Sequence, residues 1–237
     1  YDRYGNAESQ TIDVYSTANM AADSLTVHKT IVNNYGGPND TIQVLIVDDS
    51  TTPPTTTTVT KNAVYARKKG NALSSTVTEY ATKDETIAPI SQTVSIRSVF
   101  DIRGNAIDQQ SDRLVADSSG SLILVTRTVI HNGDIDARGD AHSQEITTYT
   151  TDSTGANLKV TGYQVIVNRA FDARHNVINQ MIETYDKSGA GNVLLEAQEI
   201  RSLDFNSSGV ALRQFVASYD VTTAEHKQQI HSMIEKY

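Results

Sequence analysis

Tyr-Asp-Arg-Tyr-Gly-Asn, the stretch Tyr1–Asn6, decides the fold because it returns along the chain. It recurs as Phe-Asp-Ile-Arg-Gly-Asn, Ile-Asp-Ala-Arg-Gly-Asp and Phe-Asp-Ala-Arg-His-Asn over Phe100–Asn105, Ile135–Asp140 and Phe171–Asn176, with weaker copies at Tyr35–Asp40, Ala66–Asn71 and Phe205–Val210. The first positions are 1, 35, 66, 100, 135, 171 and 205, so the period is about 35 residues and the chain holds seven units. A fixed period of this size indicates a tandem-repeat architecture.

The repeat extends beyond the turn. Its glycine position is occupied by Gly5, Gly104, Gly139 and Gly209. Five residues later, five of six copies carry a glutamine, namely Gln10, Gln109, Gln144, Gln180 and Gln214, while the sixth has Ser75. After five more residues, five of six copies carry a tyrosine, namely Tyr15, Tyr80, Tyr149, Tyr185 and Tyr219, while the sixth has Leu114. Chance does not produce this agreement.

Each unit has a second turn near its middle, seen in Asp117–Gly120, Asp152–Gly155 and Asp186–Gly189. An Asp followed three residues later by Gly is typical of a type I turn closed by a G1 bulge, a common hairpin connection. Between the turns, β-branched residues recur with period 2. Two strands per unit predict about fourteen strands.

The sequence therefore predicts an all-β protein whose residues 1–221 form an antiparallel hairpin meander in an extended or spiralling sheet. A two-sheet β-solenoid is the alternative. The recurring Gln lies between two mostly apolar positions on one strand face, which favours a buried face, although a solvent-facing Gln fits the same pattern. A solenoid would let equivalent Gln side chains bond to one another, whereas a meander would direct them to turns or backbone.

Two segments interrupt the pattern. The Thr- and Pro-rich stretch near 50–59 predicts an exposed loop or a sheet edge, because proline cannot pair in a central strand. Residues 222–237 predict a short C-terminal capping helix over about 223–235. Thr222 and Glu225 form a capping box there, and Ile230, Met233 and Ile234 follow at helical spacing.

The Tyr-Asp-x-x-Gly turn resembles the YD repeats of Rhs and teneurin-type proteins. The resemblance rests on Tyr1–Gly5, Phe100–Gly104 and Tyr185–Gly189, and this chain has Gly-Asn followed by Gln where the family usually has Gly-Arg-Leu. The resemblance implies antiparallel hairpins in a long spiralling sheet, and large secreted or surface-exposed proteins whose shell encloses a toxin or supports cell contact. The start in mid-motif without an initiating Met suggests a processed chain or a fragment of a larger protein.

Composition excludes several classes of protein. With 20 basic and 28 acidic residues the net charge is −8, which argues against nucleic acid as a partner. No stretch is apolar enough for a membrane span, and the absence of Cys removes thiolate chemistry and Cys-ligated zinc. No catalytic fingerprint occurs, so we expect no enzyme and no cofactor. One alternative is a row of turn carboxylates that binds Ca²⁺, formed by Asp2, Asp101, Asp136, Asp172 and Asp186.

We expect a structural protein that forms an extracellular or cell-surface stalk, shell wall or filament, by self-association or as part of a longer repeat array. The alternative is a surface adhesin that binds a glycan or a protein partner along its turn edge or along the tyrosine positions. The tyrosines have the opposite parity to the glutamines, so they could form a stripe for ring stacking, or they could pack against neighbouring strands.

Overall fold

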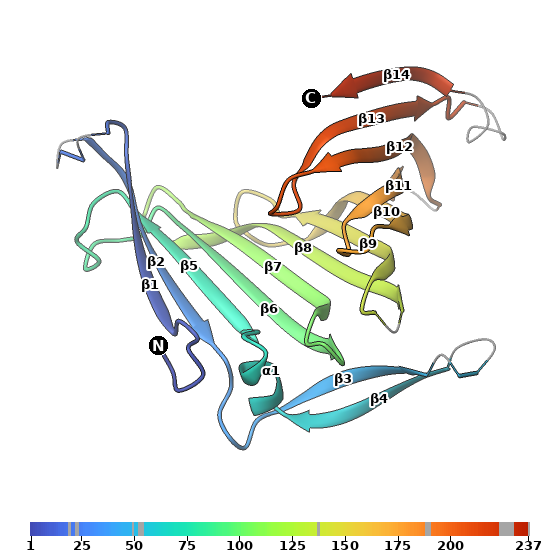
Figure 1. Ribbon diagram of the computed structural model, residues 1–237. Helices are drawn as coiled ribbons and strands as arrows, with labels where there is room; N and C mark the ends of the chain where they lie inside the picture. Colours follow the sequence, from blue (N-terminus) through green and yellow to red (C-terminus); the bar gives the residue numbers. More distant parts are fainter. Residues whose placement is uncertain are drawn as a thin grey trace. The chain divides into compact units, whose positions relative to one another are not determined.

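The computed structural model describes residues 1–18, 20–21, 24–48, 50–51, 55–136, 138–187, 191–222 and 230–236. Within these ranges it contains fourteen strands and one short helix (Figure 1). The elements are β1 (Ser9–Tyr15), β2 (Leu25–Asn34), β3 (Thr41–Asp48), β4 (Thr55–Asn62), α1 (Val64–Lys68), β5 (Ser74–Tyr80), β6 (Ser91–Asp101), β7 (Ala106–Ala116), β8 (Leu122–Ile135), β9 (Ala141–Thr150), β10 (Lys159–Phe171), β11 (Val177–Asp186), β12 (Val193–Phe205), β13 (Ala211–Tyr219) and β14 (Ile230–Lys236). The predicted all-β class and number of strands are confirmed.

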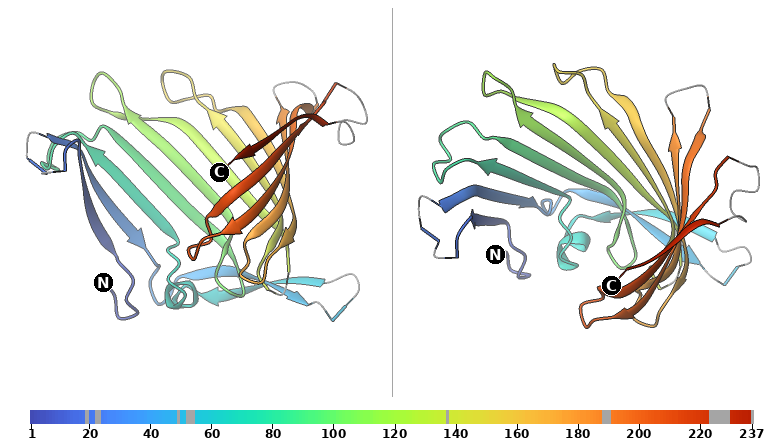
Figure 2. Two further views of the ribbon diagram at one scale, coloured as in Figure 1. Left: turned by 45° about the horizontal axis from the view of Figure 1, so that its top comes forward. Right: turned by 90° about the horizontal axis from the view of Figure 1, so that it is seen from above.

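The strands form an antiparallel meander in one open sheet. Its order is β1-β2-β5-β6-β7-β8-β9-β10-β11-β12-β13-β14, so strands from β5 onward lie beside their neighbours in sequence (Figure 2). The predicted meander is confirmed, and the solenoid alternative is wrong. The chain divides into two compact units. Unit 1 comprises Tyr1–Ile46, Thr56–Val129 and Tyr149–Lys159, and unit 2 comprises Val47–Thr55, Ile130–Thr148 and Val160–Tyr237.

One hairpin leaves the meander. β2 pairs with β5, while β3 pairs with β4 and, in parallel, with the end of β6. The reason is packing: Ile42 and Val44 of β3 are 5% and 1% exposed and form a small core of unit 1 with Phe100.

The Thr-rich stretch is irregular at Ser50 and Thr51 and a strand from Thr55 onward. Thr55 already begins β4, whose only strand partner among the described residues is β3, so the edge interpretation holds for Thr55 onward. Pro53 and Pro54 lie outside the described residues. The five-residue helix α1 follows β4, and no described helix has the length and apolar character needed to cross a membrane.

The hairpin turns follow the predicted chemistry. In the first, one Asp2 carboxylate oxygen accepts the backbone N–H groups of Tyr4 and Asn6 at 2.8 and 2.9 Å, and Gly5 has φ +83°. A left-handed residue at this place closes a type I turn with a G1 bulge, and glycine adopts it without a Cβ clash. The same carboxylate- or amide-centred pattern occurs at Asp101, Asp117, Asp136, Asp152, Asp172 and Asn206.

The predicted C-terminal helix is wrong over 230–235. Ile230–Lys236 is strand β14, antiparallel to β13 from Tyr219–Ile230 to Gln214–Lys236. The spacing of Ile230, Met233 and Ile234 fits a helix, but the open edge of β13 supplies a backbone partner for every second residue, and this tertiary pairing overrides the local pattern. Glu225 and the rest of 223–229 lie outside the described residues.

Candidate functional site

Successive turns at one edge of unit 1 are linked by asparagine side chains. Asn6 Nδ2 donates to Asp2 Oδ2 within its own turn at 3.1 Å and to the Arg67 carbonyl of the next turn at 2.8 Å. Asn71 Nδ2 likewise donates to the Gly104 carbonyl. Asn6 therefore both completes its own turn and bonds the next one, and Asn71 bonds the turn that follows it.

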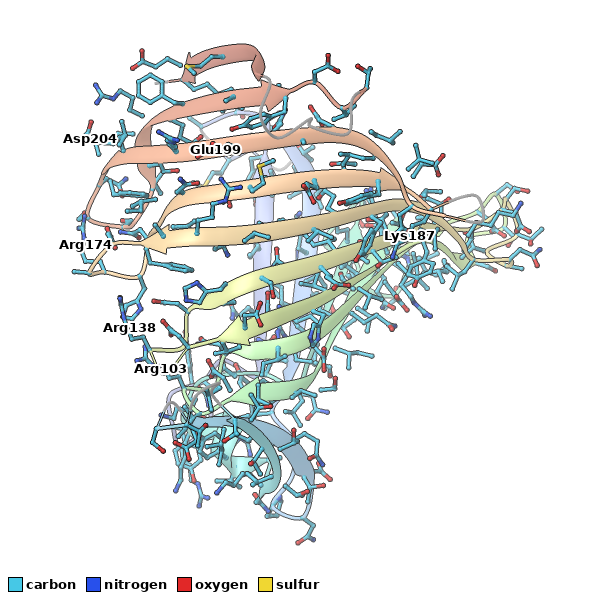
Figure 3. All side chains as sticks on the ribbon, turned by 90° about the vertical axis from the view of Figure 1, so that its right-hand side faces the viewer. Arg103, Arg138, Arg174, Lys187, Glu199 and Asp204 are labelled. Carbon is cyan, nitrogen blue, oxygen red and sulfur yellow. The ribbon has the colours of Figure 1, made fainter. Side chains whose placement is uncertain are left out.

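Unit 2 repeats this arrangement with different residues. His175 occupies the glycine position with φ +68°, and its Nδ1 lies 2.7 Å from Asp140 Oδ1 of the preceding turn. At the next turn, Asn176 Oδ1 lies 2.7 Å from the place where a Cβ on Gly209 would stand. Arg138 also donates to the Asp172 carbonyl at 3.1 Å. Figure 3 shows Arg138 and Arg174 on successive turns. We call these close approaches between successive turns the turn ladder: Asn6 to Arg67, Asn71 to Gly104, Asp140 to His175 and Asn176 to Gly209.

The repeated glutamines lie opposite a residue of the neighbouring strand. Gln144 Nε2 donates to Asn132 Oδ1 at 2.7 Å, and Gln214 Nε2 donates to Ser202 Oγ at 3.1 Å. These partners are side chains of the same hairpin, an outcome that the sequence reasoning did not include. The cross-strand neighbours of Gln10, Gln109 and Gln180 are Ile31, Arg97 and Asn168. Gln10 is exposed, whereas the other four glutamines are half-buried.

The repeated tyrosines are half-buried and do not form a freely exposed stripe. Tyr15, Tyr80 and Tyr149 lie in unit 1, and Tyr185 and Tyr219 lie in unit 2. The Tyr15 hydroxyl lies 3.3 Å from Asp13 Oδ2. The Tyr185 and Tyr219 hydroxyls donate to carboxylates, so their rings lie against the sheet with the polar end occupied.

Three tyrosine–glutamate pairs lie in unit 2. The hydroxyls of Tyr163, Tyr185 and Tyr219 donate to Glu145, Glu183 and Glu199 at 2.9, 2.7 and 2.7 Å. Glu183 and Glu199 are buried, at 8% and 7% exposure. A buried carboxylate is costly unless it is hydrogen-bonded, and these tyrosines supply such bonds.

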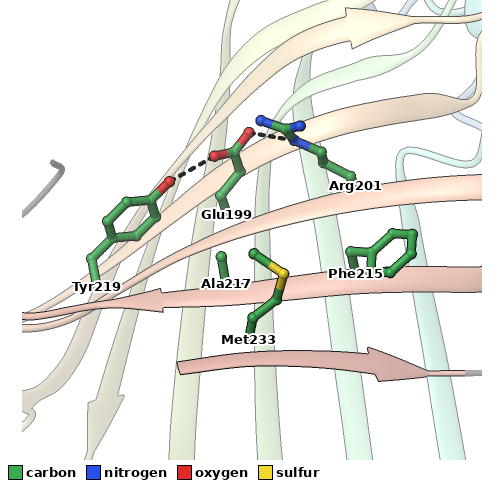
Figure 4. Close-up of a pocket in the computed structure, with 6 residues that line it drawn as sticks. All are labelled: Glu199, Arg201, Phe215, Ala217, Tyr219 and Met233. Atoms are coloured by element: carbon green, nitrogen blue, oxygen red, sulfur yellow. Dashed lines mark hydrogen bonds and ion pairs between the residues drawn. The ribbon is translucent and has the colours of Figure 1, made fainter. Parts of the chain in front are cut away.

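Glu199 forms the polar wall of a pocket of about 310 Å³ at strands β12 to β14 (Figure 4). Register explains the arrangement, because Glu199 lies opposite Ala217, Arg201 opposite Phe215 and Ala217 opposite Met233. All these side chains share one face of the strands. The lining residues are Glu199, Arg201, Phe215, Ala217, Tyr219 and Met233.

The Glu199 carboxylate is surrounded by donors. Oε1 accepts from Asn179 Nδ2 and Arg201 Nε, each at 3.0 Å, and Oε2 accepts from Tyr219. Arg169 Nη1 lies 3.7 Å from Oε1. Burial pushes the pKa of Glu199 upward, but the bonds from Tyr219, Arg201 and Asn179 outweigh it and hold the pKa below its usual value. Burial and the bond to Glu199 raise the pKa of Tyr219, so the pair is carboxylate and neutral phenol at pH 7.

The turn aspartates do not converge on a cation. In the part of the chain that the structure describes, no group of three or more His, Asp or Glu side chains is placed to hold a metal ion. Asp2, Asp101, Asp136 and Asp172 each accept backbone N–H groups of their own turns. Asp186 is the last residue of β11, and residues 188–190 that follow it lie outside the described residues. The four turn carboxylates are accounted for by hairpin geometry.

A second cluster of ionisable groups lies in unit 1 around His28, which is 6% exposed. His28 Nδ1 lies 2.6 Å from Asp13 Oδ1, and Nε2 lies 3.2 Å from Glu85 Oε1. Lys83 Nζ lies 2.6 Å from Asp13 Oδ2. The hydrogen bonds to Asp13 and Glu85 raise the pKa of His28, and the bonds from Lys83 and His28 lower the pKa of Asp13 to about 2.

This cluster predicts a pH-dependent stability. Because the folded-state pKa of His28 is raised, its contribution is fully present below the unfolded value of about 6.5 and is lost as pH rises through the folded value. We expect His28→Asn to lower the thermal midpoint most at pH 5.5 and progressively less toward pH 9. The exposed His131→Asn is the control, and an equal loss for His28→Asn at both pH values contradicts the assignment. Circular dichroism melts of both variants provide the measurement.

The pocket residues Glu199, Arg201, Phe215 and Met233 were not identified from the sequence. One local signal was present, because an acidic residue stands two places before Tyr15 and Tyr185 and so shares their strand face. Glu199 lies on the strand next to Tyr219, and only the register between β12 and β13 brings the two together.

No protein-family model matches the chain, and no curated protein matches it.

Proposed function

We propose that the chain is a structural β-repeat protein of the YD-repeat type, part of an extracellular or cell-surface stalk, shell wall or filament. The turn ladder is the observation that carries this proposal, because side chains of one turn approach the next turn in both units, although the residues differ. When every added hairpin brings the same nearest-neighbour interface, an array lengthens without a new packing solution. The resemblance of Tyr1–Gly5 to YD repeats supports the surface location.

Electron microscopy of the protein from its own source, with gold-labelled antibody against the chain, tests this role. We expect label along an extended or shell-like assembly, and on intact cells without permeabilisation. Label confined to the interior of permeabilised cells, on isolated globular particles, would contradict both the structural role and the location.

The filament form makes a separate prediction. β1 and β14 end the strand order, so a second copy could extend the sheet by strand addition at either end. Light scattering across a concentration series should then show masses above one chain. A monodisperse monomer at high concentration, without filaments in micrographs, rules out the filament form and leaves the stalk and the shell wall.

A binding module is the second candidate, and the pocket beside Tyr219 is the observation that favours it. A surface adhesin would bind a glycan or protein partner along the turn edge or along the tyrosine positions, and Tyr219 is one of these positions. Binding to a glycan array that is lost in Tyr219→Ala and kept in Tyr80→Ala supports the adhesin. Tyr80 is the control because it holds the same repeat position in unit 1. Equal binding by both variants is evidence against it.

A further inference from the structure

The floor of the pocket is apolar, and one small residue in it leaves a hollow between larger side chains. Along β13 the side chains on this face are Phe215, Ala217 and Tyr219, so a small residue stands between two rings. Met233 of β14 lies opposite Ala217 and closes the far side. A volume of about 310 Å³ lies at the lower end of small-molecule sites, which are mostly apolar with a few placed polar groups.

Arg201 is the polar group positioned to bind a ligand, because its guanidinium has hydrogen-bond donors that no protein group in the described residues uses. Its Nε–H is donated to Glu199 at 3.0 Å, which fixes the guanidinium beside the hollow (Figure 4). Within the described ranges, its two terminal nitrogens make no hydrogen bond or ion pair to a protein group, and its side chain is 64% exposed. These nitrogens form the fork that matches a carboxylate with two parallel hydrogen bonds.

The local charge favours an anion. Arg169 and Arg201 both face Glu199, so two guanidinium groups share one carboxylate, while Glu235, opposite Phe215 on the same face, is itself paired with Arg213. The chain as a whole is acidic, with a net charge of −8. An anionic ligand therefore finds in this cluster a local attraction that the whole molecule does not offer.

The lining also narrows the class of ligand. The Tyr219 hydroxyl is already donated to Glu199, and Phe215, Ala217 and Met233 offer no hydrogen bond. A sugar would leave several hydroxyls without partners on this floor, which costs binding energy. A hydrocarbon group with a single carboxylate matches both the floor and the free guanidinium.

We propose that this pocket binds a small apolar carboxylate, an alkyl or aryl carboxylic acid. The carboxylate accepts from the two terminal nitrogens of Arg201, and the hydrocarbon part lies over Ala217 between Phe215 and Met233. This binding goes beyond the structural role and does not rest on it, since a stalk or shell wall could carry the site or lack it.

Calorimetric titration with octanoate and with 1-octanol at pH 7 tests the proposal. We expect octanoate to bind at least about tenfold more tightly than octanol, because charge-assisted hydrogen bonds are the stronger ones. Arg201→Met should weaken octanoate about tenfold or more and leave octanol unchanged. Arg174→Gln, at an exposed turn arginine of unit 2 that does not line the pocket, is the control and should leave both affinities unchanged.

A second variant keeps the test decisive if Arg201→Met fails to fold. Ala217→Leu fills the hollow and retains the Arg201–Glu199 bond, so it should abolish octanoate binding. Equal binding of octanoate and octanol, unchanged binding in the folded variants, or no binding at millimolar octanoate overturns the proposal. Tighter binding of octyl phosphate than of octanoate overturns the carboxylate assignment. Electron micrographs of Ala217→Leu assemblies report separately on the structural role.

Discussion

Glu199→Ala is expected to lower the free energy of unfolding by about 2–4 kcal/mol, the largest loss of any single side chain at the pocket. Glu199 is 7% exposed and accepts bonds from Asn179, Arg201 and Tyr219. Its removal leaves three donors without an acceptor. Arg201 can reach water, so the loss stays below that of a fully enclosed ion pair.

Urea unfolding of Glu199→Ala measures this loss, with Glu196→Ala as the matched control. Glu196 lies on the same strand but is exposed, so its replacement should change stability by no more than about 0.5 kcal/mol. A similar small change for Glu199→Ala would contradict the assigned role.

The stabilisation by Glu199 should also depend on pH. The folded-state pKa of Glu199 is lowered, so its contribution is present above the ordinary glutamate pKa and is lost as pH falls through the lower folded value. The stability difference between the wild type and Glu199→Gln should therefore shrink in acid. A difference that stays constant between pH 7 and pH 3 is the contrary result.

Gly104→Ala is expected to cost about 2–4 kcal/mol through two effects. Gly104 has φ +94°, a left-handed conformation in which a Cβ is strained. The new Cβ would also stand 2.7 Å from Asn71 Nδ2 and 2.9 Å from Lys69 Cβ. Because Asn71 bonds the Gly104 carbonyl, the clash breaks a contact of the turn ladder as well.

Gly5→Ala separates the two effects. Gly5 has nearly the same conformation, φ +83°, but among the described residues nothing stands within 4 Å of its added Cβ. It should show the conformational cost alone, about 1–2 kcal/mol. Equal losses for both variants, measured by urea unfolding, would show that the turn-to-turn contact at Gly104 adds no stability.

The turn motif carried most of the fold prediction. Asp2 and its equivalents set the hairpin turns through local hydrogen bonds, which depend only on neighbouring residues and can be read from one stretch of sequence. With the turns placed, period-2 strands between them leave a meander as the simple solution. The left-handed His175 shows that the turn persists where glycine is replaced.

The failures of prediction share a cause, since each depends on contacts distant in sequence. β14 forms because the edge of β13 is open, although Ile230 and Ile234 also suit a helix. β3 does not lie between β2 and β5 but pairs with β4 and with the end of β6, where Val44 packs on Phe100. The pocket exists because register places Arg201 opposite Phe215, and no local pattern encodes that pairing.

The pairing of β2 with β5 shows how such a chain can change its length. Asn34 lies opposite Ser74 and His28 opposite Tyr80, as in any other hairpin, although the segment carrying β3 and β4 intervenes. β2 and β5 therefore hydrogen-bond to each other as neighbours, although the β3–β4 hairpin lies between them in the sequence. Insertion or deletion of a whole hairpin is then a small step in evolution, because the strands on either side retain the same up–down alternation and can pair again.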